Sequence, residues 1–92
     1  MERKRSRMDI IQDILETVQN KGGKIKPTRL MYKANLSYIQ MNSYLDELIK
    51  QDLIKREKEE KKDTHLVVIT DRGHSFCSKI KEMREFEKTF GL

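Results

Sequence analysis

The short connection around Asn35 constrains the fold more than any other stretch of this chain, because it separates two expected helices. Pro27 suits the first turn of a helix, where its fixed φ and missing N–H do no harm, so one helix should run from Pro27 to Ala34. Asn35 tolerates the left-handed backbone that a helix exit requires. A second helix should begin at Ser37. Two helices joined by one or two residues cannot lie antiparallel, so they must cross steeply.

The second helix of this pair, expected over residues 37–51, has two unlike faces. Ser37 and Gln40 form a capping-box pattern at its start. At helical spacing, Met41, Tyr44, Leu45, Leu48 and Ile49 face a core, whereas Ile39, Gln40, Asn42, Ser43, Asp46, Glu47 and Lys50 face outward. The first half of the outer face carries amides and hydroxyls without formal charge, which suits base edges in a DNA major groove. An ordinary surface helix fits this segment equally well, although the tight connection favours a helix-turn-helix arrangement.

The charge balance indicates the class of partner. The 92 residues carry a net charge of +5 with a pI near 9.4, which favours a polyanion, with an acidic membrane surface as the other option. No apolar run reaches membrane-spanning length, and the N-terminus lacks a signal-peptide apolar region. The single Cys77 cannot form an internal disulfide, which fits a reducing compartment. We therefore expect one small domain in the cytoplasm.

The first residues, MERKRSR, hold four cationic side chains and one acid. We expect a mobile arm over residues 1–8, which either contacts a nucleic-acid backbone or only aids solubility. Ser6 and Asp9 give a second capping-box pattern, and the apolar residues after them recur at i, i+3, i+4 and i+7. A helix should therefore begin near Ser6 and end before the Gly22-Gly23 pair.

Beyond Ile54 the sequence changes to LIKREKEEKKD followed by THLVVIT, which predicts a β-hairpin with a charged tip. Lys61 and Lys62 in that tip are placed to reach a phosphate. Thr70 should cap a final helix, in which Gly73 allows close approach to the rest of the fold. Along this helix apolar side chains recur at spacings of three and four, at Phe76, Ile80, Met83, Phe86 and Phe90. Because so small a domain covers only the first half of the helix, the distal side chains should form a homodimer interface.

The order helix, helix, helix, hairpin, helix is that of a winged helix-turn-helix, so the expected fold class is α+β, mostly α. The stretch TRLMYKANLSY…YLDELIKQDLI and the later VITDRG resemble the small basic archaeal winged helix-turn-helix DNA-binding proteins. The resemblance covers residues 9–90. It implies DNA binding as a homodimer, with the third helix in the major groove, the wing alongside and the long C-terminal helices paired antiparallel.

Two features depart from this family pattern. Glu87 falls at a seam position of the C-terminal helix, so the paired segment should be short or offset. Asp46, Glu47 and Asp52 make the later part of the third helix acidic. That part should either tilt away from phosphates or bind a protein partner.

These observations divide the chain into a basic arm (residues 1–8), a winged helix-turn-helix domain (9–70) and a C-terminal dimerisation helix (71–92). The candidate DNA contacts are Arg3, Lys4, Arg5, Arg7, Lys26, Thr28, Arg29, Lys33, Ser37, Tyr38, Ile39, Gln40, Asn42, Ser43, Lys61 and Lys62. The candidate dimer contacts are Phe76, Ile80, Met83, Phe86 and Phe90. Within the third helix Ser37 is used by the cap, whereas Asn42 and Ser43 are free to contact bases and Ile39 suits a thymine methyl group.

We expect no catalytic, metal or cofactor site. The sequence has no nucleophile paired with a base and no phosphate-binding glycine loop, and no small-molecule ligand is evident. His65, His74 and Cys77 supply three candidate zinc ligands where about four are needed. Cys77 should be a buried thiol, with an intermolecular disulfide as the alternative.

Three functional classes remain. The first is a nucleoid-associated DNA-binding dimer that regulates transcription or organises chromatin. The others are a protein-interaction module and a nucleic-acid binder that acts through charge alone.

Overall fold

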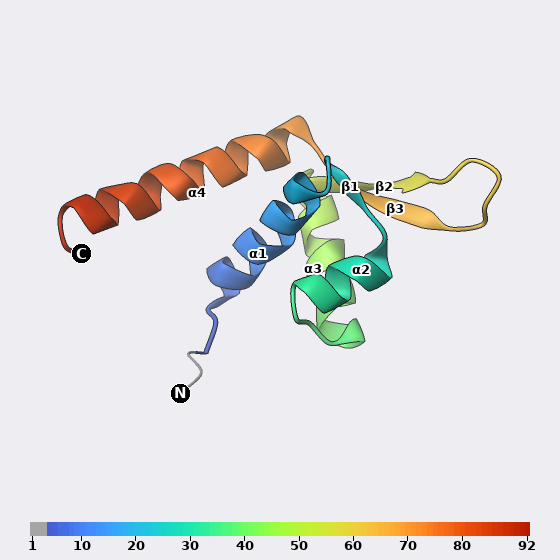
Figure 1. Cartoon of the computed structure of the whole chain (residues 1–92), viewed down its shortest axis with the longest axis horizontal. Coiled ribbons are helices and arrows are strands. Elements are labelled where there is room, and N and C mark those ends of the chain that lie inside the picture. Colours follow the sequence, from blue (N-terminus) through green and yellow to red (C-terminus); the bar gives the residue numbers. More distant parts are fainter. Residues whose placement is uncertain (1–3) are drawn as a thin grey trace.

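A computed structural model describes residues 4–92, and Arg3 lies outside this range. The elements in chain order are α1 (Arg7–Asn20), β1 (Lys24–Ile25), α2 (Pro27–Lys33), α3 (Tyr38–Lys50), β2 (Ile54–Lys58), β3 (His65–Ile69) and α4 (Asp71–Thr89) (Figure 1). This order confirms the expected fold class, α+β and mostly α, and the expected succession of three helices, a hairpin and a last helix. The hairpin and the C-terminal end of α4 project from opposite sides of the body (Figure 1).

The element that the sequence did not predict is β1. It pairs antiparallel with β3, which gives a three-stranded sheet in the order β1-β3-β2. Gly22 and Gly23 adopt positive φ values of 75° and 90°, which turn the chain from α1 into this strand. The Ile69 N–H then donates to the Gly23 carbonyl at 3.0 Å. A strand of two residues has no alternation to recognise, so only the pairing with β3 defines it.

The core forms where α1, α2 and α3 pack against the sheet. Its largest fully buried side chains are Ile14, Leu15, Val18, Leu30, Leu45, Leu48, Ile54 and Val67. Among residues 4–92, no polar or charged residue is buried. The hydrophobic effect therefore holds the three helices together, and the polar contacts between elements lie outside this buried core.

The predicted helix starts are confirmed. Ser6 and Ser37 each cap a helix with a complete capping box, and Thr70 accepts a hydrogen bond from the Gly73 N–H. α1 begins at Arg7, so the helix already starts within the segment that the sequence assigned to the arm. Asn35 has a φ of 54°, the left-handed conformation expected at the exit of α2.

Two stripes of side chains run along α4. We call Gly73, Cys77, Ile80 and Arg84 the inner stripe, because it faces the domain, and Phe76, Lys79, Met83, Phe86 and Phe90 the outer stripe. Ile80 is 6% exposed, whereas Phe90 is 65% exposed. Arg84 reaches across to Asp9 of α1 at 2.7 Å.

The expected dimer contact at Ile80 is therefore wrong, because the chain buries that side chain itself. Both stripes use spacings of three and four, so the sequence alone could not separate them, and Lys79 takes the place of Ile80 in the outer stripe. Glu87 falls beside the inner stripe, three residues after Arg84, and not on the outer one. Phe76 belongs to the outer stripe but also packs partly against the core.

Candidate nucleic-acid interface

The turn between α2 and α3 is held by a side chain from the N-terminal segment. Arg5 donates to the carbonyl oxygens of Ala34 and Asn35 at 2.7 and 2.8 Å, and to the Asp13 carboxylate at 2.9 Å. The assignment of Arg5 to a DNA phosphate is therefore corrected, since its guanidinium is occupied within the chain. Carbonyls at a helix end have no partner within the helix, and a fixed cation satisfies them. Arg5 positions α3 relative to α1.

The first turn of α3 is exposed and carries no acid. Ser37 accepts a hydrogen bond from the Gln40 N–H, and the Gln40 side chain accepts one from the Ser37 N–H, both at 3.1 Å. Both predicted site residues are thus engaged in the cap. Ser43 is exposed and Asn42 is half-buried, so Ser43 is the more accessible of the two. The positive end of the helix dipole adds to the attraction for a phosphate.

Large side chains without formal charge surround this first turn. Ile39 is 80% exposed and Tyr38 is also exposed. Tyr32 on α2 is 78% exposed and was missed by the sequence analysis. The sequence does contain a signal for Tyr32. In the short amphipathic helix α2, Leu30 and Ala34 face inward, and Tyr32 does not share their face. Exposed tyrosine combines an apolar ring with a hydroxyl, which suits an interface.

The N-cap and one face of α2 carry a row of cations. Lys26, Arg29 and Lys33 are exposed at helical spacings of three and four, and Thr28 beside them is exposed too. Within the part of the chain that the structure describes, none of these three cations forms an ion pair. Lys4 is likewise exposed. Cations without a protein partner are available to a polyanion, and their helix adjoins the start of α3.

The acids of α3 are matched by cations of the same chain. Glu47 pairs with Arg7, and Asp46 lies 3.9 Å from Arg56 of β2. Arg7 was expected to contact DNA and is instead engaged with Glu47. Asp52 has a φ of 59° at the end of α3, and its carbonyl accepts a hydrogen bond from the Thr70 hydroxyl at 2.6 Å. Glu47 and Asp46 therefore link α3 to α1 and β2, and the backbone of Asp52 links the end of α3 to the cap of α4.

The wing is charged along its whole length. Lys61 and Lys62 are exposed at its tip, and Lys62 lies 3.8 Å from Glu59. Lys24 of β1 pairs with Glu57 of β2 at 2.9 Å, and this hydrogen bond lowers the pKa of the Glu57 carboxyl. Lys61 keeps a free charge at the tip among residues 4–92, so it remains the better candidate for a phosphate.

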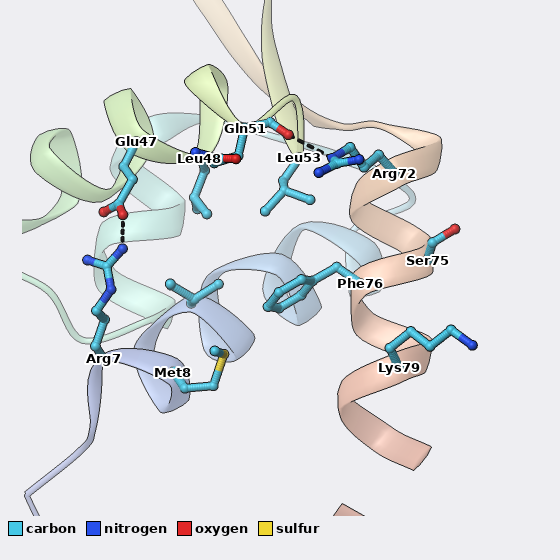
Figure 2. Close-up of a pocket in the computed structure, with 11 residues that line it drawn as sticks. Arg7, Met8, Glu47, Leu48, Gln51, Leu53, Arg72, Ser75, Phe76 and Lys79 are labelled. Atoms are coloured by element: carbon cyan, nitrogen blue, oxygen red, sulfur yellow. Dashed lines mark hydrogen bonds and ion pairs between the residues drawn. The ribbon is translucent and has the colours of Figure 1, made fainter. Parts of the chain in front are cut away.

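A groove of about 470 Å³ lies between α1, α3 and α4, although the sequence had indicated no pocket. Its apolar lining comes from Met8, Ile11, Leu48, Leu53 and Phe76, and its polar lining from Arg7, Glu47, Gln51, Arg72, Ser75 and Lys79. Figure 2 shows Met8, Leu48, Leu53 and Phe76 pointing into the hollow from three helical segments and the α3–β2 connection. The Arg72 Nε donates to the Gln51 carbonyl at 2.9 Å on one rim.

The candidate zinc ligands do not converge. Cys77 is buried, and burial raises the pKa of its thiol, so it is a poor thiolate ligand. His74 shares a 2.8 Å hydrogen bond with the Gln19 amide. Over residues 4–92 no group of three or more potential ligands could hold a metal ion. In the same range, no helix is both long enough and apolar enough to cross a bilayer.

Comparisons with known proteins identify the family. Residues 4–88 match the winged helix-turn-helix family. The chain is 35% identical to the uncharacterized protein MJ0287 of Methanocaldococcus jannaschii over 82 residues, or 89% of this chain and 76% of that protein. The crystal structure of Sso10a-2, a DNA-binding protein from Sulfolobus solfataricus, has a TM-score of 0.76 at 29% identity, covering 94% of this chain and 85% of that one. MarR of E. coli, solved with operator DNA, has a TM-score of 0.69 at 18% identity, covering 75% of this chain and 49% of that one, which shows the fold alone. The chain therefore belongs to the winged helix-turn-helix family.

Proposed function

We propose that this protein binds double-stranded DNA as a homodimer, with α3 in the major groove and the wing alongside, and that it regulates transcription or organises chromatin. The observation that carries this proposal is the exposed first half of α3. It has no acid in its first turn, it offers Ile39 and Ser43 to base edges, and it adjoins the cations of α2 and its N-cap, which form no ion pair within residues 4–92. The description of Sso10a-2 as a DNA-binding protein at 29% identity supports the same function.

Contacts to phosphates and contacts to bases have different roles. Lys26, Arg29 and Lys33 neutralise phosphates, which positions the protein without reading sequence. Ile39, Asn42 and Ser43 carry the sequence preference, with Ile39 against a thymine methyl group and the polar pair at donor or acceptor edges. Tyr32 and Tyr38 flank this reading surface.

A protein-interaction module was the alternative, and acids on α3 were the reason to consider it. Both Asp46 and Glu47 have cationic partners within the chain. Glu47 is therefore engaged within the chain, whereas the Asp46 side chain is 68% exposed and stays accessible. This weakens the specific support for the alternative, which becomes an outcome of the binding experiment below.

The homodimer is supported by the outer stripe. Met83, Phe86 and Phe90 are exposed along the distal half of α4, and the Phe86 and Phe90 ring centroids lie 4.8 Å apart. Apolar side chains in a continuous stripe usually mark an interface. The double variant M83E/F86E should therefore be a folded monomer that binds DNA more weakly, as measured by light scattering and circular dichroism. A wild type that is monomeric at micromolar concentration contradicts the dimer.

The decisive test of DNA reading compares a preferred duplex, selected from random sequence, with a scrambled one. Alanine at Asn42 or Ser43 should cost about 1 to 3 kcal/mol on the preferred duplex if the residue contacts a base, and much less on the scrambled one. Alanine at the exposed Ser78 of α4 is the matched control. Equal losses on both duplexes indicate binding through the backbone alone, and no binding to either indicates a protein partner.

Salt dependence tests the phosphate contacts separately. A dimer that contacts roughly 6 to 10 phosphates should lose about three to five decades of affinity between ~50 and ~200 mM salt. Alanine at Arg29 or Lys33 should reduce that slope and weaken all sequences alike. A flat salt dependence rules out the proposed use of the α2 cations.

A further inference from the structure

The turn between α2 and α3 sets the direction in which the base-reading helix leaves the helix that carries the phosphate contacts. On the α2 side, the Leu36 N–H donates to the Met31 carbonyl at 3.0 Å, and Asn35 has a φ of 54°. The carbonyl oxygens of Ala34 and Asn35 receive no hydrogen bond from a backbone N–H within residues 4–92. The backbone therefore leaves two acceptors of this turn to a side chain.

Arg5 supplies that side chain and joins the turn to α1. Its Nη1 donates to the Ala34 carbonyl at 2.7 Å and to the Asp13 carboxylate at 2.9 Å, and its Nη2 donates to the Asn35 carbonyl at 2.8 Å. A guanidinium is a rigid planar fork, so the three acceptors around it are held in fixed relative positions. The Arg5 side chain is only 30% exposed, and its charge faces the carboxylate of α1.

We infer that Arg5 is a specificity-determining positioning residue, which fixes the angle between α2 and α3 without touching DNA. This inference rests on the proposed function, in which Arg29 and Lys33 of α2 hold phosphates while Ile39 and Ser43 of α3 face base edges. The angle between the two helices then decides which bases lie under α3 once the phosphates are bound. Such contacts must be placed to within about 0.5 Å, so a small change at the turn removes them.

The same N-terminal segment holds α3 near its other end. Arg7 pairs with Glu47 in the later half of α3 (Figure 2), and Ser6, between the two arginines, caps α1. Residues 5–7 thus tie α3 to the start of α1 near both of its ends. Arg5 acts at the end that carries the base-reading side chains. Its loss should therefore displace the reading surface while the ion pair of Arg7 still holds the later half of the helix.

Binding of Arg5→Ala and Arg5→Lys to the preferred and the scrambled duplex tests this role. Arg5→Ala should weaken binding to the preferred duplex about 10-fold, the order of one lost base contact, and leave binding to the scrambled duplex and the salt dependence nearly unchanged. Arg5→Lys keeps the charge but lacks the planar fork, so it should lose most of the same discrimination. Lys4→Ala removes a neighbouring exposed charge and is the matched control. Its ratio of the two affinities should equal that of the wild type.

The ratio of the two affinities separates positioning from a general loss of folding. Partial unfolding lowers both affinities by the same factor and leaves their ratio unchanged, and circular dichroism reports it directly. Asp13→Asn removes the anchor of Arg5 on α1 and should also lower the ratio. Because the two residues act through one contact, adding Asp13→Asn to Arg5→Ala should lower the ratio no further.

Two results overturn the inference. Equal weakening on both duplexes, with a smaller salt dependence and full rescue by Arg5→Lys, makes Arg5 a phosphate contact. An unchanged ratio in Arg5→Ala means that packing alone sets the angle of α3. Failure of the proposed function is distinct, because the wild type itself then binds both duplexes equally or binds neither, and the inference falls with it.

Discussion

The two stripes of α4 have nearly the same spacing and opposite environments. The inner stripe meets the domain through Gly73, Cys77 and Ile80, all buried, and ends at Arg84, which pairs with Asp9. The outer stripe is more apolar in composition, yet Met83, Phe86 and Phe90 are exposed. The side of a helix that packs within its own chain is therefore set by which residues tolerate close approach, and hydrophobicity alone does not decide it.

This comparison predicts that changes in the inner stripe affect folding, whereas changes in the outer stripe affect association. Stability against denaturant measures the first, and light scattering measures the second. Circular dichroism of each variant shows whether the fold survives. The predictions below concern the inner stripe and the contacts that hold it, from the largest expected effect to the smallest.

Gly73→Ala should have the largest effect. A Cβ at this position would lie 2.2 Å from the Leu53 carbonyl oxygen and 2.6 Å from the Ile69 Cγ1, and both atoms belong to packed parts of the fold. Alanine gains about 1 kcal/mol of helix propensity over glycine, which is far too little to offset such a clash. We expect a loss of about 4 kcal/mol or more, or failure to fold. Urea unfolding checks this against Ser78→Ala, and near-equal stabilities would refute the close approach.

Ile80→Ala should cost about 2 to 3 kcal/mol, because it removes buried methyl groups and leaves a cavity between α4 and the domain. The matched control is Met83→Ala, because Met83 lies three residues further along α4 but belongs to the outer stripe. It should leave the stability of the monomer nearly unchanged while weakening the dimer. If the two variants are equally destabilised at concentrations where the chain is monomeric, the division into two stripes is incorrect.

Thr70→Ala should cost about 1 kcal/mol through loss of the helix cap. The Thr70 oxygen accepts from the Gly73 N–H at 3.0 Å, and its hydroxyl donates to the Asp52 carbonyl at 2.6 Å. Thr70→Ser keeps both hydrogen bonds and should retain most of the stability. Thermal unfolding of the two variants compares them, and equal losses would show that the methyl group matters more than the cap.

Acid should weaken the two contacts that Asp9 makes, with Ser6 in the α1 cap and with Arg84 at the end of the inner stripe, with the smallest effect of the four. Hydrogen bonds from the Ser6 backbone and side chain, and from Arg84, lower the pKa of Asp9 in the folded chain. Its contribution to stability is therefore present above the unfolded pKa and is lost as the pH falls through the folded pKa. The melting temperature of Asp9→Asn should fall less steeply than that of the wild type as the pH is lowered below about 5. Parallel curves would contradict this role. The pKa of Glu57 is also lowered, but Glu57 is present in both the wild type and the variant. The difference between their melting curves therefore comes from Asp9.

Local patterns in the sequence were sufficient for most of the fold. Ser6, Ser37 and Thr70 marked the helix starts, because a capping hydroxyl acts within three residues of its own position. Asn35 marked the tight turn, since its left-handed backbone is also a local property. The winged helix-turn-helix order followed from these signals, and so did the exposed first half of α3.

Only the tertiary structure decided which side chains meet across long separations. Arg5 was expected to contact phosphate, yet it holds the Ala34 and Asn35 carbonyls, and Arg7 is paired with Glu47. The strand β1 and the groove likewise exist only because distant segments come together. A side chain's partner depends on the folded arrangement and not on its neighbours in sequence. For that reason the sequence by itself determined the elements and their order, and packing determined which face of α4 was buried and which charges stayed free.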